Sequence, residues 1–304
     1  MSADVAGTPP AAPKVSLVIG SGSVKCAAAI GVAQVLDEAG IGIDRVVGCS
    51  AGAIFATLVA QRNDAATARK RTVELWTKDL TAKGNTRALL SVLAPKLFGF
   101  SLGRFGLRDD RKLNERLLEA FGDLNIEDTP VPLHITATDF GTGDLVELRT
   151  GPVARAIRAS LAIPFAFSPV EIDGRQLVDG YLSDPLPISV AMKHGARVIV
   201  AVGFESPVQE NIASAGRFAF QLSSIMSNNL LRARFSFHSV AHHAEVITII
   251  PEFAERIRLF DTAKVPYIIE AGAEAARSQI DYLRRLLSAD AAPAHPTAVL
   301  ADSK

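Results

Sequence analysis

The sequence predicts an α/β fold with a largely parallel central sheet, because units of strand, sharp turn and helix recur along the chain. A short β-branched run at 15–19 ends in a glycine-rich turn, and a helical pattern follows from about 25 to 39. A second apolar run at 45–47 stops at Gly48, and strong helix formers follow it from 51 to 61. Such alternation favours strands that lie in parallel, with helices packed on the sheet.

Three later segments continue the alternation as strand candidates, at 133–138, 197–202 and 245–250. Apolar residues recur at helical spacing in 218–240 and again in 268–287, which predicts two helices whose apolar sides face the core. The apolar positions of the first helix are Phe218, Leu222, Ile225, Met226, Leu230, Ala233, Phe237 and Val240.

One domain is expected, because no repeat of solenoid length and no linker interrupts the middle of the chain. We place this domain at 14–288. The segment 1–13 is rich in alanine, proline and small residues and is expected to be a disordered tail. The segment 289–304 carries prolines among alanines and is expected to be a loose tail.

The charge balance argues against a polyanionic partner. Lysine plus arginine equals aspartate plus glutamate at 32 each, so no net field favours nucleic acid. The two cysteines, Cys26 and Cys49, are compatible with a reducing compartment. The start of the chain lacks the apolar run of a secretory signal, and no stretch approaches the roughly 20 apolar residues that cross a bilayer. We therefore expect a cytoplasmic protein that is at most peripheral to a membrane.

The segment Gly48-Cys49-Ser50-Ala51-Gly52 fits the G-x-S-x-G pattern of a nucleophile elbow, between an apolar strand and a helix. The pattern needs small residues, because side chains at Gly48 or Gly52 would collide with the neighbouring strand or helix. The turn would lift the hydroxyl of Ser50 out of the sheet to a helix N-terminus, where developing negative charge is favoured. The alternative is a strand-to-helix turn whose serine only caps the helix.

A glycine loop, Gly20-Ser21-Gly22-Ser23, ends the first strand and opens a helix, so its backbone amides are placed to face an anion. A dinucleotide fingerprint would need a third glycine where Lys25 stands and an acidic residue at the end of the second strand. The second strand ends instead in the serine elbow. An oxyanion hole fits better, with Lys25 adding positive charge close by, and a purely steric turn is the remaining alternative.

The serine needs a base, and the six histidines are awkwardly placed for that role. His238 and His242 are four residues apart, but no third ligand at a persuasive spacing accompanies them, so we expect no metal site. Asp179, followed by Gly180 in a short turn, is the other option. A carboxylate with its ordinary pKa of about 3.9 is a weak base for an alcohol, so burial should raise the pKa of Asp179.

Four motifs follow one another: the glycine loop, the G-C-S-A-G elbow, the stretch R-A-S-x-A-x-P-x-x-F-x-P-V at 158–170, and the V-D-G turn at 178–180. Together they resemble the patatin-like phospholipase family, over a span of about 15 to 287. The resemblance implies a three-layer α/β/α fold and a dyad of Ser50 and Asp179 without histidine. It also implies a serine-dependent lipid acyl hydrolase of phospholipase A or lysophospholipase type. Its partner would be a phospholipid or another fatty-acyl ester, and no cofactor is expected.

Two departures from the family pattern bear on activity. The glycine loop carries Lys25-Cys26 where the family usually has Arg-Gly, and Tyr181 follows the acid turn where the family usually has glycine or alanine. Lysine keeps the charge but lacks the planar fork of arginine, and the other two residues add bulk. A weakly active or inactive lipid-binding protein is therefore one alternative. Another is a hydrolase of soluble esters or thioesters with the same dyad, or, as a minor variant, with a triad that includes His238 or His242.

The segment 81–108 has no acidic residue, and its basic residues alternate with large apolar ones. The pattern is typical of a lid that contacts anionic lipid, and it is our candidate for peripheral membrane contact. The alternative is a packed helical hairpin with a solvated basic edge. The basic residues are Lys83, Arg87, Lys96, Arg104 and Arg108.

Overall fold

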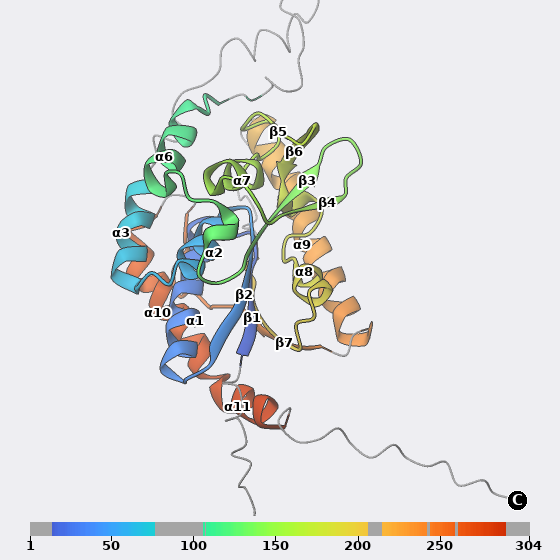
Figure 1. Ribbon diagram of the computed structural model, residues 1–304. Coiled ribbons are helices and arrows are strands. Elements are labelled where there is room, and N and C mark those ends of the chain that lie inside the picture. Colours follow the sequence, from blue (N-terminus) through green and yellow to red (C-terminus); the bar gives the residue numbers. More distant parts are fainter. Residues whose placement is uncertain are drawn as a thin grey trace, which may run out of the picture.

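The computed structural model describes residues 14–76, 106, 108–205, 215–241, 244–258 and 261–289, and it is built around one eight-stranded sheet (Figure 1). The strands are β1 (Lys14–Ile19), β2 (Gly42–Cys49), β3 (Leu133–Asp139), β4 (Leu145–Leu148), β5 (Val170–Ile172), β6 (Arg175–Asp179), β7 (Val198–Val202) and β8 (Glu245–Ile249). Hydrogen-bonded neighbours run β5, β6, β3, β2, β1, β7, β8, and β4 pairs with β3.

The parallel part of the sheet consists of β3, β2, β1, β7 and β8. These strands coincide with the runs that the sequence predicts, so the α/β class with a mostly parallel sheet is confirmed. The strands β4, β5 and β6 are antiparallel additions beside β3. They escape prediction because they are short and only partly buried, which leaves no long apolar run in the sequence.

The pairing of β3 explains how distant parts of the chain meet. β4 pairs with residues 135–138 along one edge of β3, so β2 and β6 share the other edge. On that edge Cys49, the last residue of β2, is the partner of Thr136, and Asp179, the last residue of β6, is the partner of Ala137. The C-terminal ends of β2 and β6 therefore converge on neighbouring residues of β3.

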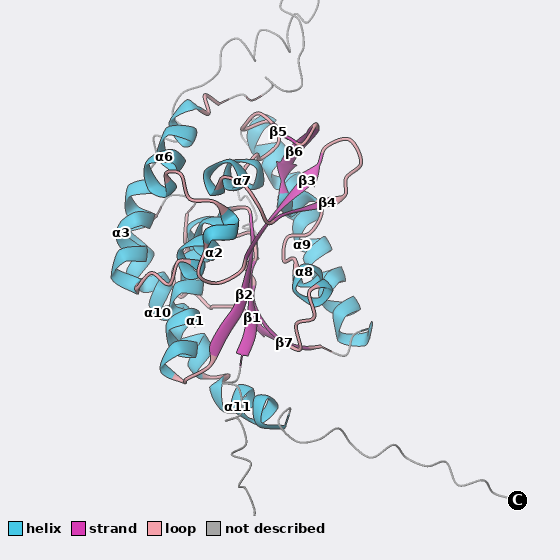
Figure 2. Ribbon diagram, in the orientation of Figure 1, coloured by secondary structure: helices cyan, strands magenta, loops and turns pink. Residues whose placement is uncertain are grey.

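Helices cover both faces of the sheet (Figure 2). One face is packed by α1, α2, α7 and α10, and the other by α8 and α9. The helix bounds are α1 (Ala28–Glu38), α2 (Ala51–Ala60), α3 (Ala65–Leu75), α6 (Arg111–Phe121), α7 (Val153–Ser160), α8 (Ile188–Lys193), α9 (Ala215–Ala241), α10 (Val265–Arg277) and α11 (Ile280–Ala289). Among the helices described, none is long and apolar enough to cross a bilayer.

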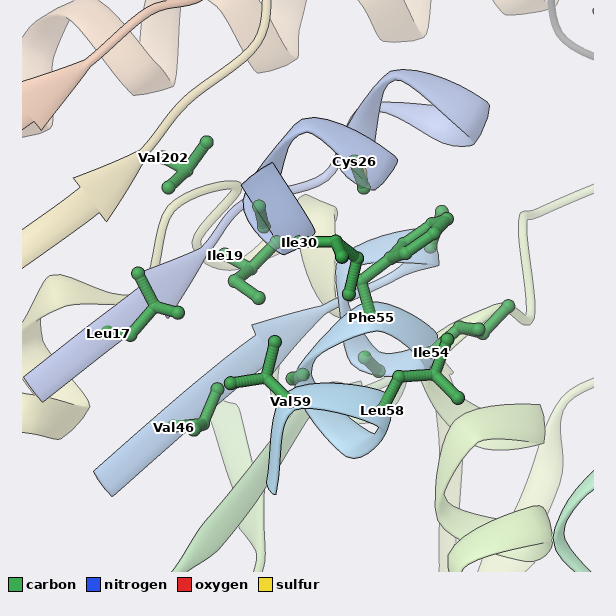
Figure 3. Packing of buried hydrophobic residues seen from close by; sticks show 14 of the residues in the cluster. Leu17, Ile19, Cys26, Ile30, Val46, Ile54, Phe55, Leu58, Val59 and Val202 are labelled. Atoms are coloured by element: carbon green, nitrogen blue, oxygen red, sulfur yellow. The ribbon is translucent and has the colours of Figure 1, made fainter. Parts of the chain in front are cut away.

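Alternation along β1 divides the core into two. Leu17 and Ile19 point to the first face, where they join Ile30 of α1 and Phe55 of α2 in one cluster (Figure 3). Val18 points to the opposite face and joins a smaller cluster formed by α8 and α9. Burial on both faces explains why the parallel strands read as continuous apolar runs in the sequence.

The first face contains a close crossing of two helices, α1 and α10. A Cβ atom built at Gly31 would lie 2.0 Å from the carbonyl oxygen of Ile269, and one built at Gly272 would lie 2.0 Å from that of Ala28. These distances are far below van der Waals contact, so the helices touch backbone to backbone and only glycine fits at both positions.

The orientation of α9 corrects the prediction that its apolar side faces the core. Phe218, Leu222, Ile225 and Met226 are exposed. Among the side chains of this helix that the structure describes, the buried ones are Ser224, Ser227 and Leu231. Helical spacing of apolar residues predicts that a helix has an apolar face, but it does not predict which way that face points.

Several predicted segments lie outside the described residues. These are the tail 1–13, most of the tail 289–304, and nearly all of the basic segment 81–108. The proposed lid and the boundaries of the domain therefore stay predictions.

Candidate active site

Ser50 occupies a sharp turn between β2 and α2. Its φ angle is +55°, a backbone conformation that residues other than glycine rarely adopt. Its backbone N–H donates to the hydroxyl of Ser160 over 2.7 Å, and that hydroxyl donates to the carbonyl oxygen of Thr136 over 2.7 Å. The turn is thus tied to α7 and β3. The sequence contains Ser160 in its third motif, but nothing in the motif reveals this role.

The glycines of the elbow are required by close packing. A Cβ atom at Gly48 would lie 2.6 Å from the Cα atom of Ala53, and one at Gly52 would lie 2.5 Å from the carbonyl oxygens of Ile19 and Gly20. The collisions involve backbone atoms, which have no freedom to move aside. The second contact also shows that the glycine loop lies directly against the start of α2.

Asp179 lies within hydrogen-bond distance of Ser50. The hydroxyl of Ser50 donates to Oδ2 of Asp179 over 2.8 Å, and the backbone N–H of Tyr181 donates to Oδ1 over 3.1 Å. The carboxylate is fully buried, while Ser50 keeps 7% of its surface exposed. Because β2 and β6 end opposite neighbouring residues of β3, the sheet itself brings these side chains together.

Burial raises the pKa of Asp179 to about 7, although the hydrogen bonds from Tyr181 and Ser50 oppose the shift. A carboxylate with this pKa is a much stronger base than an ordinary aspartate, and about half of it is still ionised near neutral pH. The arrangement can therefore take a proton from a serine hydroxyl without a histidine.

The amides of the glycine loop differ in their availability. The N–H of Gly20 donates to Val202 over 3.0 Å, and that of Ser21 donates to Pro185 over 2.8 Å. Within the described part of the chain, the N–H groups of Gly22 and Ser23 have no such partner, and they stand at the N-terminus of the 3-10 helix η1 (Ser23–Ala27). The amides free to bind an anion are therefore those of Gly22 and Ser23.

The departures Lys25 and Cys26 help to fasten this loop. Lys25 Nζ donates to the carbonyl oxygen of Glu205 over 2.6 Å, which joins η1 to the segment after β7. Cys26 Sγ donates to the carbonyl oxygen of Gly20 over 3.3 Å. Burial raises the pKa of both cysteine thiols, Cys26 and Cys49, so neither is a ready nucleophile.

The side chain of Tyr181 is directed toward α9. Its hydroxyl lies 2.8 Å from Oγ of Ser223, and burial raises the pKa of this phenol to about 12. Gly180, in the same turn, has no room for a side chain, because a Cβ atom there would lie 2.6 Å from the carbonyl oxygen of Thr136. The turn after β6 is thus fixed on one side by β3 and on the other by α9.

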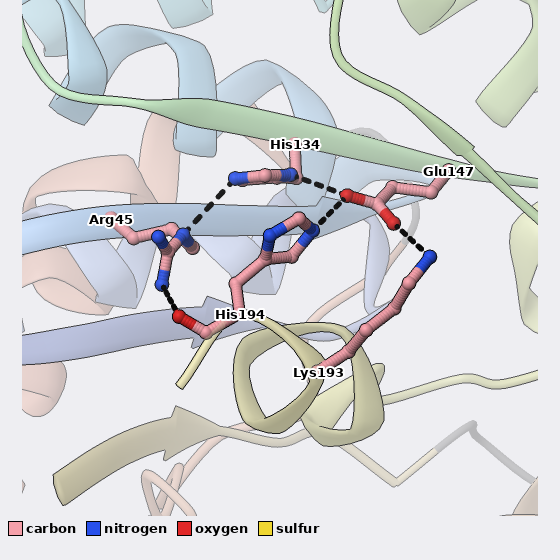
Figure 4. Close-up of polar contacts among 5 residues, drawn as sticks. All are labelled: Arg45, His134, Glu147, Lys193 and His194. Atoms are coloured by element: carbon pink, nitrogen blue, oxygen red, sulfur yellow. Dashed lines mark hydrogen bonds and ion pairs between the residues drawn. The ribbon is translucent and has the colours of Figure 1, made fainter. Parts of the chain in front are cut away.

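A cluster of titratable side chains lies elsewhere on the sheet, around Glu147 of β4 (Figure 4). Oε1 of Glu147 is 2.8 Å from Nδ1 of His134 and 2.5 Å from Nε2 of His194, and Oε2 is 3.1 Å from Nζ of Lys193. The two histidines and Glu147 offer ligand atoms within 4.8 Å of one another. Sequence reasoning missed the cluster, because its members lie far apart in the chain.

The hydrogen bonds of this cluster indicate that the nitrogen of His134 that faces Glu147 carries a proton and does not bind a metal ion. Arg45 donates from Nε to Nε2 of His134 over 3.1 Å, so the ring proton of His134 resides on Nδ1 and points at Glu147. A histidine that binds a metal through Nδ1 carries its proton on Nε2, where it would meet the N–H of Arg45. The side chains of His238 and His242, which are four residues apart in the sequence, lie outside those that the structure describes.

Comparison with known proteins decides the family. A model described as patatin-like phospholipase matches residues 17–192. The chain belongs to the patatin-like phospholipase family. The matched region contains the glycine loop, the elbow, α7 and Asp179, and it ends inside α8, before β7, α9 and β8.

The relatives of this patatin-like chain are mostly longer proteins. An uncharacterised NTE family protein of Mycobacterium tuberculosis (strain ATCC 25618 / H37Rv) is 35% identical over 190 residues, which are 62% of this chain and 49% of that protein. Lysophospholipase NTE1 of Cryptococcus neoformans is 29% identical over 189 residues, 62% of this chain and 11% of that protein. The chain thus spans about half the length of the first relative and far less of the second.

A solved structure shows the same fold. The crystal structure of VipD from Legionella pneumophila aligns with a TM-score of 0.50 and 16% identity, over 90% of this chain and 67% of that one. At this identity the likeness concerns the architecture alone.

Proposed function

We propose that the chain is a serine-dependent lipid acyl hydrolase, of phospholipase A or lysophospholipase type, with Ser50 as nucleophile and Asp179 as base. The observation that carries the proposal is the 2.8 Å hydrogen bond from Ser50 to the buried, basic carboxylate of Asp179. Membership of the phospholipase family supports a lipid substrate. The relative named as a lysophospholipase makes lysophospholipid the first natural substrate to test.

Acylation begins when Ser50 Oγ attacks the carbonyl carbon of the ester while its proton passes to Asp179. The carbonyl oxygen becomes an oxyanion, and the free amides of Gly22 and Ser23 are the donors that would stabilise it. Each such donor contributes about 3 kcal/mol to catalysis when it is aimed at the tetrahedral intermediate. The intermediate collapses by breaking the ester C–O bond, and the departing alcohol takes the proton from Asp179.

Deacylation repeats the steps with water as the nucleophile. Asp179 accepts a proton from the water, whose oxygen attacks the acyl carbon. The bond between that carbon and Ser50 Oγ then breaks, the fatty acid leaves, and Ser50 recovers its proton from Asp179. The enzyme returns to its starting state.

The test compares the unmodified protein with Ser50→Ala and Asp179→Asn on a short-chain p-nitrophenyl ester and on lysophospholipid micelles. Matched controls are Ser278→Ala and Asp173→Asn, which alter an exposed serine and an exposed aspartate away from the dyad. Loss of turnover in the first pair alone, without a lower unfolding temperature, supports the dyad.

A fluorophosphonate label separates the alternatives. A label on Ser50 of the unmodified protein identifies an active nucleophile, even where the natural ester is unknown. Turnover of the p-nitrophenyl ester without turnover of any lipid would indicate a hydrolase of soluble esters. Absence of both label and turnover would indicate a lipid-binding protein and would overturn the mechanism.

A further inference from the structure

The backbone of Asp184 contacts two parts of the proposed active site. The thiol of Cys49, the residue before Ser50, donates to the carbonyl oxygen of Asp184 over 3.4 Å. The N–H of Asp184 donates to the carbonyl oxygen of Gly180, the residue after Asp179, over 3.1 Å. The elbow and the acid turn are therefore both hydrogen-bonded to this one residue.

The next residue, Pro185, contacts the third part, the glycine loop. Its carbonyl oxygen accepts the 2.8 Å hydrogen bond from the N–H of Ser21. A Cβ atom built at Gly20 would lie 2.9 Å from the same oxygen, so the loop rests directly on this backbone. Ser21 immediately precedes Gly22, whose free amide is a proposed oxyanion donor. The position of Pro185 thus sets the position of the donor.

The carboxylate of Asp184 closes a turn around Pro185. Its Oδ1 accepts the N–H of Leu186 over 3.2 Å, which is the bond from an aspartate to the residue two positions on that is typical of an Asx turn. Its Oδ2 accepts the hydroxyl of Ser189 over 3.3 Å and lies 4.0 Å from Nε of Arg234 in α9. The side chain thereby fixes the conformation of the backbone that contacts the glycine loop.

The surroundings of this carboxylate suit a positioning role and not a chemical one. Asp184 is 1% exposed, so it has no surface to offer a substrate, and the hydroxyl of Ser50 donates to Asp179 instead. Burial raises the pKa of Asp184 to about 6, although the charge of Arg234 opposes the shift. At pH 8 the group is ionised and acts only as a hydrogen-bond acceptor.

We propose that Asp184 is a positioning residue of the hydrolase, whose carboxylate holds the turn at 184–186 and thereby keeps the glycine loop aligned with Ser50 and Asp179. The inference rests on the proposed function. Donors and reacting groups must be placed closely, since a displacement of about 1 Å can lower a rate about 100-fold. One buried side chain would thus align three parts of the site that come from distant segments of the chain.

The experiment measures kcat and KM on a short-chain p-nitrophenyl ester at pH 8, well below the unfolding temperature of each variant. Asp184→Ala removes both acceptor oxygens. Asp184→Asn loses the charge but keeps Oδ1 as an acceptor for the N–H of Leu186. The matched control is Asp64→Ala, which removes another carboxylate that accepts a backbone N–H, that of Thr67 over 2.7 Å at the start of α3.

Asp184→Ala should lower kcat about 100-fold and leave KM nearly unchanged, because the alignment matters in the transition state. Asp184→Asn should keep kcat within about tenfold of the parent, since its amide oxygen restores the turn. Asp64→Ala should lower the unfolding temperature without lowering kcat. A kcat of Asp184→Ala equal to that of the parent would overturn the proposal. So would an Asp184→Asn variant as slow as Asp184→Ala, because the charge and not the hydrogen bond would then be what matters.

If Asp184→Ala does not fold, Asp184→Asn still decides, since a folded variant with kcat more than about tenfold below the parent would overturn the proposal. Failure of the proposed function looks different. A parent protein with neither turnover nor a fluorophosphonate label on Ser50 would overturn both proposals. An active parent whose rate does not depend on Asp184 would overturn this inference alone.

Discussion

The hydroxyl of Ser160 accepts a hydrogen bond from the backbone amide of Ser50 over 2.7 Å and donates to the carbonyl oxygen of Thr136 over the same distance. One side chain thereby joins α7, the elbow and β3. Because Ser50 has a positive φ angle, the turn depends on surrounding contacts to hold its conformation. Ser160 is therefore a positioning residue for the proposed nucleophile.

Ser160→Ala should lower kcat about tenfold, because it leaves the amide of Ser50 without its acceptor and loosens the turn. KM should change little, since Ser160 is fully buried and has no surface to offer a substrate. The control is Thr57→Ala, which removes a buried hydroxyl of α2 that donates to the carbonyl oxygen of Ala53 in its own helix. Steady-state kinetics on a soluble ester would give kcat and KM for each variant. An unchanged kcat in Ser160→Ala would refute the positioning role.

The rate should depend on one ionisation near neutral pH. Asp179 accepts a proton only when it is ionised, and its pKa is about 7. With a neutral ester, kcat/KM should therefore rise as the pH increases through about 7 and stay level above it. A profile that is flat from about pH 5 to about pH 9, with chemistry limiting, would show that Asp179 is not the base.

The same shift makes Asp179 a source of instability at high pH. Its pKa is about 7 in the folded chain against an ordinary 3.8, so the folded state binds more protons between these values. Stability should thus fall as the pH rises from about 4 to about 7. Asp179→Asn removes this dependence. The unfolding free energy of the variant minus that of the parent should therefore be larger at pH 8 than at pH 4, by on the order of a few kcal/mol. Urea titrations of both proteins at the two pH values measure this difference. The same change in unfolding free energy with pH in parent and variant would contradict the prediction.

Glu147→Gln should destabilise the protein at neutral pH. Burial opposes ionisation of Glu147, yet hydrogen bonds from Lys193, His194 and His134 lower its pKa to about 2. The resulting stabilisation is present above about pH 4.5 and is lost as the pH falls toward 2. We expect the variant to lose about 1–3 kcal/mol of unfolding free energy at pH 7, and progressively less below pH 4.5.

The control for this variant is Glu245→Gln, which changes an exposed glutamate at the start of β8. Added zinc should leave the unfolding temperature of the parent unchanged, because Arg45 occupies the second nitrogen of His134. A rise in unfolding temperature with zinc that disappears in Glu147→Gln would reveal a metal site instead.

Gly272→Ala sets helix propensity against packing. Alanine favours a helix over glycine by about 1 kcal/mol, but the added carbon would lie 2.0 Å from the carbonyl oxygen of Ala28. Packing should prevail, with a loss of about 3 kcal/mol. Glu274→Ala, on the exposed side of α10, should stay within about 0.5 kcal/mol of the parent. Equal unfolding midpoints for the two variants would mean that α1 and α10 are less closely packed than described.

The sequence predicts the parallel strands well because both of their faces are buried, as Leu17 and Val18 illustrate on opposite sides of β1. It does not predict β6, whose place depends on a long-range pairing with β3. The spacing of residues in the sequence therefore does not predict that Asp179 lies next to Ser50. Only the resemblance of the motifs to a known family implies it. The network around Glu147 has no motif, so nothing in the sequence reveals it.

The pairing of β6 with the edge of β3 also affects when activity arises during folding. The elbow is built from neighbouring segments, whereas the dyad joins residues 129 positions apart in the chain. Closing so long a loop is slow compared with local contacts, because its entropy must be overcome first. In a chain whose core has formed but whose β5–β6 hairpin has not docked, Ser50 would be in place and Asp179 would not yet be within reach of it. Recovery of activity on refolding should thus lag behind recovery of the helical signal, and the lag would time the docking of a single hairpin.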